Sequence, residues 1–349
     1  MRTDLFDYSL PPERIAAHPL AERGASRLLE LAATGVRHRR FAEWVSLLPR
    51  GALLVINDTR VLKARLLGRK QATGGRIELL LLRPLAHTPG RERWSALGRA
   101  SKPLRAGTRI DVGDVAVSVV ERLEDGTVVV EVPVSEGGIP SFLERHGHVP
   151  IPPYLGREDD AEDVERYQSV FARRAGSVAA PTASLHFDQR TLHELKARGI
   201  ERAPITLHIG AGTFRPVTTE DLDEHPMHAE WIDVPEATAY AVARVRSSGS
   251  PVVAVGTTVV RALESATGED GVVRAFRGET QLMIQPGYRF RAVDSLLTNF
   301  HMPQSTLLAL VSAFAGRERV LAAYAEALRE GYRFLSYGDA MWIPSCEEC

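Results

Sequence analysis

The sequence has almost no cysteine and no long apolar run. Its 349 residues include two cysteines, Cys346 and Cys349, both within the last four positions. A core held by disulfides is therefore excluded, and the pair is expected to lie in an exposed tail. No segment approaches the roughly 20 apolar residues that cross a bilayer, and the first residues lack the pattern of a secretory leader. These absences predict a soluble protein of the cytoplasm.

Motifs of the commonest enzyme classes are also missing. The chain has no Gly-x-Ser-x-Gly turn, no phosphate-binding Gly-Lys-Thr loop, no His-Glu-x-x-His motif and no paired Cys-x-x-Cys motifs. Their absence argues against the most frequent types of hydrolase, kinase and zinc enzyme.

The net charge of −1 gives no global attraction for an anionic partner, but the charges are unevenly distributed. Residues 60–76 hold six Lys or Arg and no acid, and residues 91–109 repeat this bias with Glu92 as their only acid. Contact with phosphates and the solvated faces of strands both explain the pattern, and the two remain open. Residues 158–165 are acidic and would repel a phosphate backbone.

The texture of the chain predicts a large α/β domain with an inserted β domain. Short β-branched runs punctuated by glycines favour strands at residues 77–82, 93–97, 108–112, 115–120 and 127–132. Asp125-Gly126 is typical of a hairpin turn, so the insert is expected to be a small antiparallel barrel or sandwich. The expected domains are an α/β catalytic domain of residues 1–65 and 150–349 and a β-rich inserted domain of residues 66–149.

Flanking the insert, the pattern alternates between strands and helices. Strands are expected at residues 52–56, 205–209 and 251–255, and helices at residues 259–266, 305–316 and 317–331. Asp188 is placed to cap a further helix that ends at Gly199.

Residues 176–187 form the first segment that could carry chemistry. Small residues here let a backbone approach a ligand closely, and Thr182, Ser184 and His186 would share one face if the segment is extended. The histidine could move a proton. A satisfied loop histidine in a small-residue turn explains the spacing equally well, so the pattern alone leaves both open.

A second candidate lies where two predicted strands end. His208 and Thr206 face away from the apolar side of residues 205–209, and Gly210 permits a turn at the carboxyl end, where α/β sheets bind ligands. The third glycine and the helix of a dinucleotide fingerprint are absent. At Thr257 and Thr258, backbone amides that begin a helix could meet a carboxylate or hydroxyl, or simply form a capped turn.

Two aromatic segments, residues 286–303 and 332–339, complete the set. Aromatic rings among Arg, Asn, His and Asp suit stacking on a purine with hydrogen bonds to its edge. Asn299 and His301 would project to one side of an extended segment. Packing in an aromatic core is the alternative for each stretch.

Together these segments resemble the S-adenosylmethionine:tRNA ribosyltransferase-isomerase family of queuosine biosynthesis. The likeness runs along the whole chain and rests on residues 6–11, 57–61, 166–168, 176–187, 207–217, 254–258, 261–264, 298–303 and 332–339. One departure is Ser184, which stands where the family usually has glycine. The Cys-Glu-Glu-Cys tail also lies outside the family pattern.

The resemblance implies a reaction and its partners. S-adenosylmethionine would donate its ribosyl group to 7-aminomethyl-7-deazaguanine at the wobble position of tRNA, giving epoxyqueuosine, adenine and methionine. It implies no metal and no bound cofactor, since S-adenosylmethionine is a co-substrate. It also implies an α/β domain with an inserted β-barrel, and leaves open whether the enzyme is a monomer or a homodimer.

Roles for single residues follow from that chemistry as hypotheses. His186 and His208 are candidates for the base that takes a proton from the carbon beside the sulfonium, and Asp339, Asn299 or His301 could assist the leaving adenine. Asp58 could hold the ammonium of the methionine group, and Arg60 its carboxylate or a tRNA phosphate. The remaining expected substrate contacts are Thr182, Ser184, Gly210, Thr213, Arg215, Thr257, Thr258 and Tyr337.

Two other functions are compatible with parts of the pattern. A non-catalytic RNA-binding protein would use the barrel to grip single-stranded or loop RNA. An ordinary methyltransferase would release S-adenosylhomocysteine in place of adenine and methionine.

Overall fold

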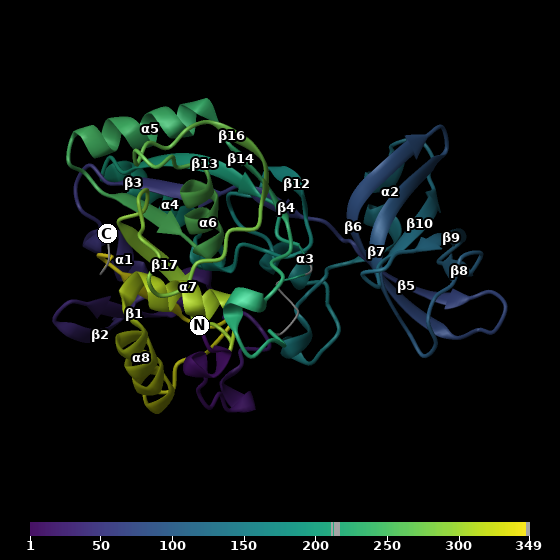
Figure 1. Ribbon diagram of the computed structural model, residues 1–349, viewed down its shortest axis with the longest axis horizontal. Helices are drawn as coiled ribbons and strands as arrows, with labels where there is room; N and C mark the ends of the chain where they lie inside the picture. The colour runs from purple at the N-terminus through teal and green to yellow at the C-terminus, as the bar shows by residue number, and fades with distance from the viewer. Residues whose placement is uncertain (211, 213–216, 347–349) are drawn as a thin grey trace.

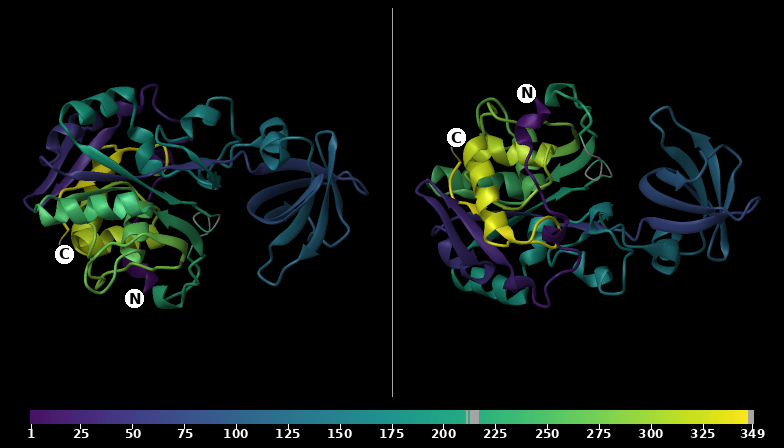
Figure 2. Two further views of the ribbon diagram at one scale, coloured as in Figure 1. Left: turned by 90° about the horizontal axis from the view of Figure 1, so that it is seen from above. Right: turned by 90° about the horizontal axis from the view of Figure 1, so that it is seen from below.

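The computed structural model describes residues 1–210, 212 and 217–346 and consists of two parts (Figure 1). A large α/β part contains both chain ends, and a β-barrel formed by one internal stretch stands beside it, joined by extended segments (Figure 2). The predicted fold class, an α/β domain with an inserted antiparallel barrel, is confirmed. No helix in the described part of the chain is long and apolar enough to span a membrane.

The α/β part is built on a nine-stranded sheet with the order β16-β14-β13-β3-β15-β17-β18-β1-β2. Its strands are β1 (Arg27–Ala32), β2 (Gly35–Arg40), β3 (Leu53–Asn57), β13 (Glu201–Leu207), β14 (Glu230–Val234), β15 (Val252–Val255), β16 (Phe276–Thr280), β17 (Ser295–Asn299) and β18 (Ala340–Ile343). The central strands β13, β3, β15 and β17 are parallel to one another. Strand β14 runs antiparallel to β13, and β18 runs antiparallel to β17 but parallel to β1. The carboxyl ends of the four central strands therefore lie at the same edge as the amino ends of β14, β18 and β1.

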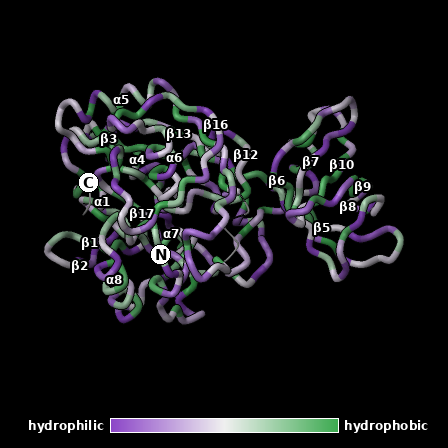
Figure 3. The backbone as a smooth tube through the Cα atoms, in the orientation of Figure 1, coloured by the Kyte–Doolittle hydropathy of each residue, from purple (hydrophilic) through white to green (hydrophobic). Residues whose placement is uncertain are grey.

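Helices cover both faces of this sheet. They are α1 (Trp44–Leu47), α4 (Gln189–Ala197), α5 (Glu236–Ser247), α6 (Thr257–Ser265), α7 (Thr306–Ala315) and α8 (Arg317–Arg329). Alternation along β3 sends Leu53 and Val55 into a core shared with α5, α6, α7 and α8, and Leu54 into a second core shared with α1 and α4. The central strands β3, β15 and β17 are buried along their whole length and run through the α/β part (Figure 3).

The barrel has its own core and closes on itself. Its elements are β5 (Arg65–Lys70), β6 (Arg76–Thr88), β7 (Arg91–Ala100), β8 (Arg109–Val112), β9 (Val115–Arg122), β10 (Val128–Pro133), α2 (Gly138–His146) and β11 (Gly147–His148). Pairing of β5 with β8 joins the first and last strands of the order β5-β6-β7-β10-β9-β8. Phe142 and Leu143 of α2 pack into this core, so the helix contributes to the barrel interior.

Several local predictions are confirmed, and one is wrong. Gly126 takes φ +85° between β9 and β10, as a hairpin at Asp125-Gly126 requires, and the Asp188 side chain accepts the Thr191 N–H at the start of α4. Cys346 is half-buried against the main core, so the expected exposed tail does not describe this residue. Cys349 lies outside the described residues.

Five short elements complete the site region. Strand β4 (Thr59–Val61) pairs in parallel with β12 (Arg174–Ser177). The 3-10 helices η3 (Arg23–Ala25) and η6 (Thr182–His186) and the short helix α3 (Asp163–Arg166) lie near the edge where the central strands end.

Candidate active site

The predicted site segments meet at the carboxyl edge of the sheet. The central strands end at Leu207, Asn57, Val255 and Asn299, and each is followed directly by a segment that the sequence singled out. Asp339 precedes the antiparallel strand β18 and so lies at the same edge. Segments from Asn57 to Asp339 of the chain thus meet at one edge, because parallel strands end on one side of a sheet.

His208 is the most firmly oriented imidazole at this edge. Its Nδ1 forms a hydrogen bond of 2.8 Å with Oγ1 of Thr59. One face of the ring stacks on Trp231 at 5.0 Å between centroids, and Gly176 lies so close that a Cβ there would sit 2.6 Å from Nε2. The ring is therefore held by its neighbours while Nε2 remains available to exchange a proton with a ligand.

The environment of His208 keeps it neutral. Burial, and to a smaller extent the positive charge of Arg174, lower its pKa to about 4. Arg174 is itself paired with Asp233 at 2.6 Å. At neutral pH the imidazole is therefore unprotonated and can act as a base.

Asp58 and Arg60 follow β3, but they do not face the same surroundings. The Asp58 carboxylate is buried and accepts a 2.6 Å hydrogen bond from Oγ1 of Thr206, and burial raises its pKa. Arg60 is exposed on β4. The two residues expected to hold one amino-acid group are thus differently placed.

Residues 182–186 are not extended. They form the 3-10 helix η6, so the predicted common face of Thr182, Ser184 and His186 is wrong. Three residues per turn, in place of the two-residue repeat of a strand, rotate these side chains apart. Ser184 has no positive φ, so the residue that replaces the family glycine fits its backbone without strain.

His186 lies on the inner side of η6. Its Nδ1 exchanges a 2.8 Å hydrogen bond with Oγ of Ser26, a residue from the amino-terminal segment. Burial lowers its pKa to about 4; the adjacent Asn299 amide opposes this shift and the positive charge of Arg23 adds to it. Nε2 of His186 and Oδ1 of Asn299 are both buried without a hydrogen-bond partner in the described structure, which leaves two polar atoms for a ligand.

Asp339 and His301, the other candidates from the aromatic segments, have hydrogen-bond partners within the protein. Asp339 accepts the backbone N–H groups of Arg27 and Arg333, each at 2.8 Å, which makes it a support for the loop before β18. Nε2 of His301 exchanges a 2.9 Å hydrogen bond with Thr298, and burial lowers the His301 pKa to about 4. The geometry gives Asp339 a structural task that the sequence did not reveal.

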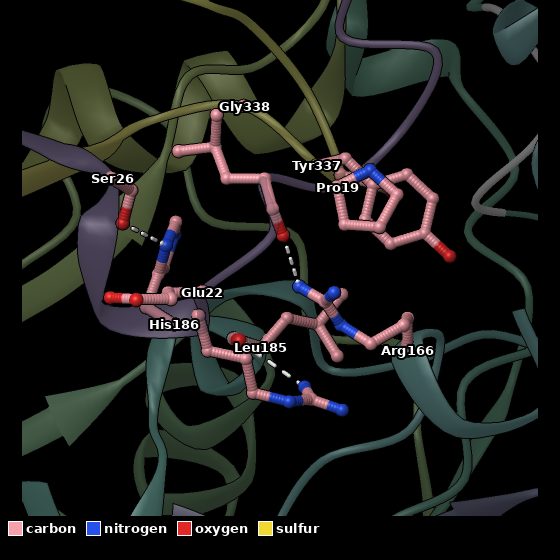
Figure 4. A pocket seen from close by; sticks show the side chains of 11 residues that line it. Pro19, Glu22, Ser26, Arg166, Leu185, His186, Tyr337 and Gly338 are labelled. Atoms are coloured by element: carbon pink, nitrogen blue, oxygen red, sulfur yellow. Dashed lines mark hydrogen bonds between the residues drawn. The ribbon is translucent and has the colours of Figure 1, made fainter. Parts of the chain in front are cut away.

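A pocket opens beside His186 (Figure 4). Ser26, Glu22 and His186 lie along one side of it, and Arg166 and Tyr337 along the other. Tyr337 Oη donates to Asp163 at 2.6 Å. Arg157 grips the same carboxylate through two nitrogens at 2.6 and 2.8 Å, so the tyrosine ring is held in place.

The predicted glycine and threonine site residues lie in the turns that follow the central strands. Gly256 takes φ +92° just before α6, and Oγ1 of Thr258 accepts the Asn57 amide at 3.3 Å. Thr257 is buried at the helix start. The Gly210 N–H donates to Glu230 at 3.2 Å. Among the described residues no three His, Cys, Asp or Glu side chains form a group that could hold a metal ion.

Comparison with known proteins places the chain in a family. A family model described as "Queuosine biosynthesis protein" matches residues 3–343. The S-adenosylmethionine:tRNA ribosyltransferase-isomerase of Sorangium cellulosum is 52% identical, with 98% of each chain covered. That of Magnetococcus marinus is 47% identical, covering 99% of this chain and 95% of its own. The chain belongs to this family of S-adenosylmethionine:tRNA ribosyltransferase-isomerases.

A solved structure agrees with this membership. The crystal structure of S-adenosylmethionine tRNA ribosyltransferase from Thermotoga maritima is 33% identical in sequence to the present chain. The match covers 97% of the present chain and 99% of the Thermotoga chain. The TM-score of 0.54 shows a shared fold.

Several site residues of the ribosyltransferase-isomerase have no signal in the sequence pattern. Trp231 and Glu230 come from an antiparallel strand, and Ser26 reaches His186 from 160 positions away. Glu230 forms a buried ion pair with Arg261 of α6. Two expected contacts, Thr213 and Arg215, lie outside the described residues.

Proposed function

We propose that this ribosyltransferase-isomerase transfers the ribosyl group of S-adenosylmethionine to 7-aminomethyl-7-deazaguanine at the tRNA wobble position. The products are epoxyqueuosine in tRNA, adenine and methionine. The observation that carries the chemistry is His208, a neutral imidazole clamped between Trp231 and Gly176 at the edge where four strands end. Such a group supplies the base that the first step needs.

The reaction begins with loss of a proton from the ribosyl carbon beside the sulfonium. That proton passes to Nε2 of His208. The electron pair left on carbon forms a double bond to the neighbouring ring carbon, whose bond to the ring oxygen breaks. The ring oxygen then forms a carbonyl at the carbon that carried adenine, and adenine leaves and takes up a proton. The aminomethyl nitrogen of the tRNA base then attacks the sugar, and methionine leaves as the epoxide closes. No external oxidant or reductant is required.

Other residues bind and orient the substrates in this proposal. We assign Oδ1 of Asn299 and Nε2 of His186 to the substrate because both atoms are buried without a hydrogen-bond partner in the described structure, and His186 is a second candidate base. In this proposal Asn299 and His301 hold the departing adenine. Asp339 supports the loop around them through its two backbone contacts. S-adenosylmethionine enters as a co-substrate, with no bound cofactor or metal, and because tRNA is the partner we place the reaction in the cytoplasm.

The test replaces His208 and His186 singly with Ala and measures adenine release with precursor tRNA present. We expect His208→Ala to lower the rate constant by about 100- to 10,000-fold, the usual contribution of a general base. The exposed His193 on α4 provides the control His193→Ala, which should retain full activity. Full activity in both site variants would overturn the assignment of the base.

Product analysis tests the reaction itself. Mass spectrometry of the small molecules and of the tRNA should show adenine, methionine and epoxyqueuosine. Methylated tRNA with S-adenosylhomocysteine would identify a methyltransferase instead. Bound tRNA without any small-molecule product would identify an RNA-binding protein.

A further inference from the structure

The pocket beside His186 contains an arginine without an acidic partner. Arg23 is half-buried and donates to two backbone oxygens, those of Leu185 at 3.2 Å and Glu165 at 2.8 Å. In the described part of the chain no carboxylate lies within ion-pair distance of its guanidinium. Three of its five N–H donors thus remain for a ligand.

A second guanidinium makes the pocket more positive. Arg166 donates to the backbone oxygen of Leu20 at 2.6 Å and pairs with the exposed Glu162 at 3.0 Å. Burial and, after it, repulsion by the charge of Arg166 lower the pKa of Arg23, whereas the carboxylates of Glu165 and Asp188 oppose this shift. An anion that enters the pocket relieves this repulsion.

The rest of the lining identifies the anion. Leu20, Leu185 and Pro19 provide apolar walls, and Glu22 adds one exposed carboxylate at the rim. A phosphate would be repelled by Glu22, whereas a group with both a carboxylate and an ammonium satisfies both charges. The planar guanidinium also matches a carboxylate through paired hydrogen bonds.

We propose that this pocket binds the α-amino-acid group of the sulfonium substrate, with its carboxylate on Arg23 and Arg166 and its ammonium facing Glu22. The inference rests on the proposed function and names a part of the substrate site for it. His186 lines the same pocket, so a sulfonium bound through this group lies beside His186, the second candidate base. Asp58 and Arg60, expected from the sequence to hold this group, are a buried hydrogen-bonded carboxylate and an exposed cation on another strand.

Ligand analogues combined with charge variants test the proposal in the full-length enzyme. Isothermal titration measures the Kd of S-adenosylmethionine and of its decarboxylated form for the wild type and Arg23→Gln. We expect Arg23→Gln to raise the Kd of S-adenosylmethionine by about 10- to 100-fold, which corresponds to one lost charge-assisted contact. The Kd of the decarboxylated form should rise by less than about threefold. Arg190→Gln, at an exposed arginine of α4, is the matched control and should bind as the wild type does.

A second variant does not depend on the contacts of Arg23 with the backbone. Glu22 is exposed, so Glu22→Gln should fold normally. This variant should raise the Kd of S-adenosylmethionine several-fold and leave the Kd of an analogue without the amino group unchanged. Equal weakening of all ligands in both variants would show a structural effect and overturn the proposal.

Two further results distinguish a failure of this inference from a failure of the proposed function. If S-adenosylmethionine binds the Arg23→Gln variant normally while tRNA binding is lost in a salt-dependent manner, the pocket holds a phosphate and the proposal is wrong. If the wild type releases no adenine and binds no S-adenosylmethionine, the proposed function itself fails.

Discussion

At the residue scale, the orientation of His208 depends on the absence of a side chain at Gly176. A Cβ at this position would lie 2.6 Å from Nε2 of the imidazole, so Gly176→Ala must displace the ring. We expect adenine release to slow by about 100-fold, the cost of misplacing a catalytic group by about 1 Å, with little change in S-adenosylmethionine affinity. The control Gly75→Ala, in a barrel loop where the nearest atom is 3.4 Å away, should be silent.

Buried histidines also make the stability depend on pH. The pKa of His301 is lowered to about 4 by burial, from 6.5 in an unfolded chain. The unfolded state binds the proton first, so this stability is present above pH 6.5 and is lost as the pH falls toward 4. In urea unfolding between these values, His301→Gln should reduce the slope of unfolding free energy against pH by about 1.4 kcal/mol per unit. An unchanged slope would show that His301 is protonated in the folded protein.

Small residues around His186 and strand alternation at His208 marked both as candidates, and the family resemblance made them candidate bases, yet the sequence could not provide their partners. Thr59 and Ser26 are common residue types, and only the fold brings them to the imidazoles. Asp339 shows the opposite limit. Its polar motif predicted a catalytic group, whereas burial and two backbone contacts make it a support.

At the element scale, helix caps were readable from sequence and can be tested alone. Asp188 accepts the Thr191 N–H at 2.7 Å and begins α4 directly after η6. Asp188→Ala should lower the free energy of unfolding by about 1 kcal/mol, whereas Asp188→Ser should restore most of it. Adenine release should stay unchanged in both. A loss of activity that Ser does not restore would mean that Asp188 also positions η6.

The same scale shows where local pattern fails. A strand and a 3-10 helix both accommodate the short sequence Thr182–His186, and contacts with β17 and η3 decide between them. Apolar runs such as β3 and β15 were predicted correctly because burial on both faces leaves few alternatives.

At the scale of the whole molecule, the sequence predicted the insert because its short β-branched runs differ from the alternating strands and helices that flank it. Closure of the barrel could not be predicted in this way, because it depends on pairing between strands that are distant in the sequence. Ile110 of β8 is fully buried and lies opposite Lys70 of the closing strand β5. Ile110→Ala should therefore destabilise the barrel by about 2–5 kcal/mol.

Because the barrel core is a cluster distinct from the cores of the α/β part, although it includes Val178 from that part, this loss should remain mostly local. Calorimetry should show one transition moved to lower temperature, with the Kd of S-adenosylmethionine unchanged. The exposed Leu85 of β6 provides the control Leu85→Ala, which should leave both values as they are. If Ile110→Ala weakens S-adenosylmethionine binding as strongly as it lowers stability, the two parts fold as one unit and the barrel supports the substrate site directly.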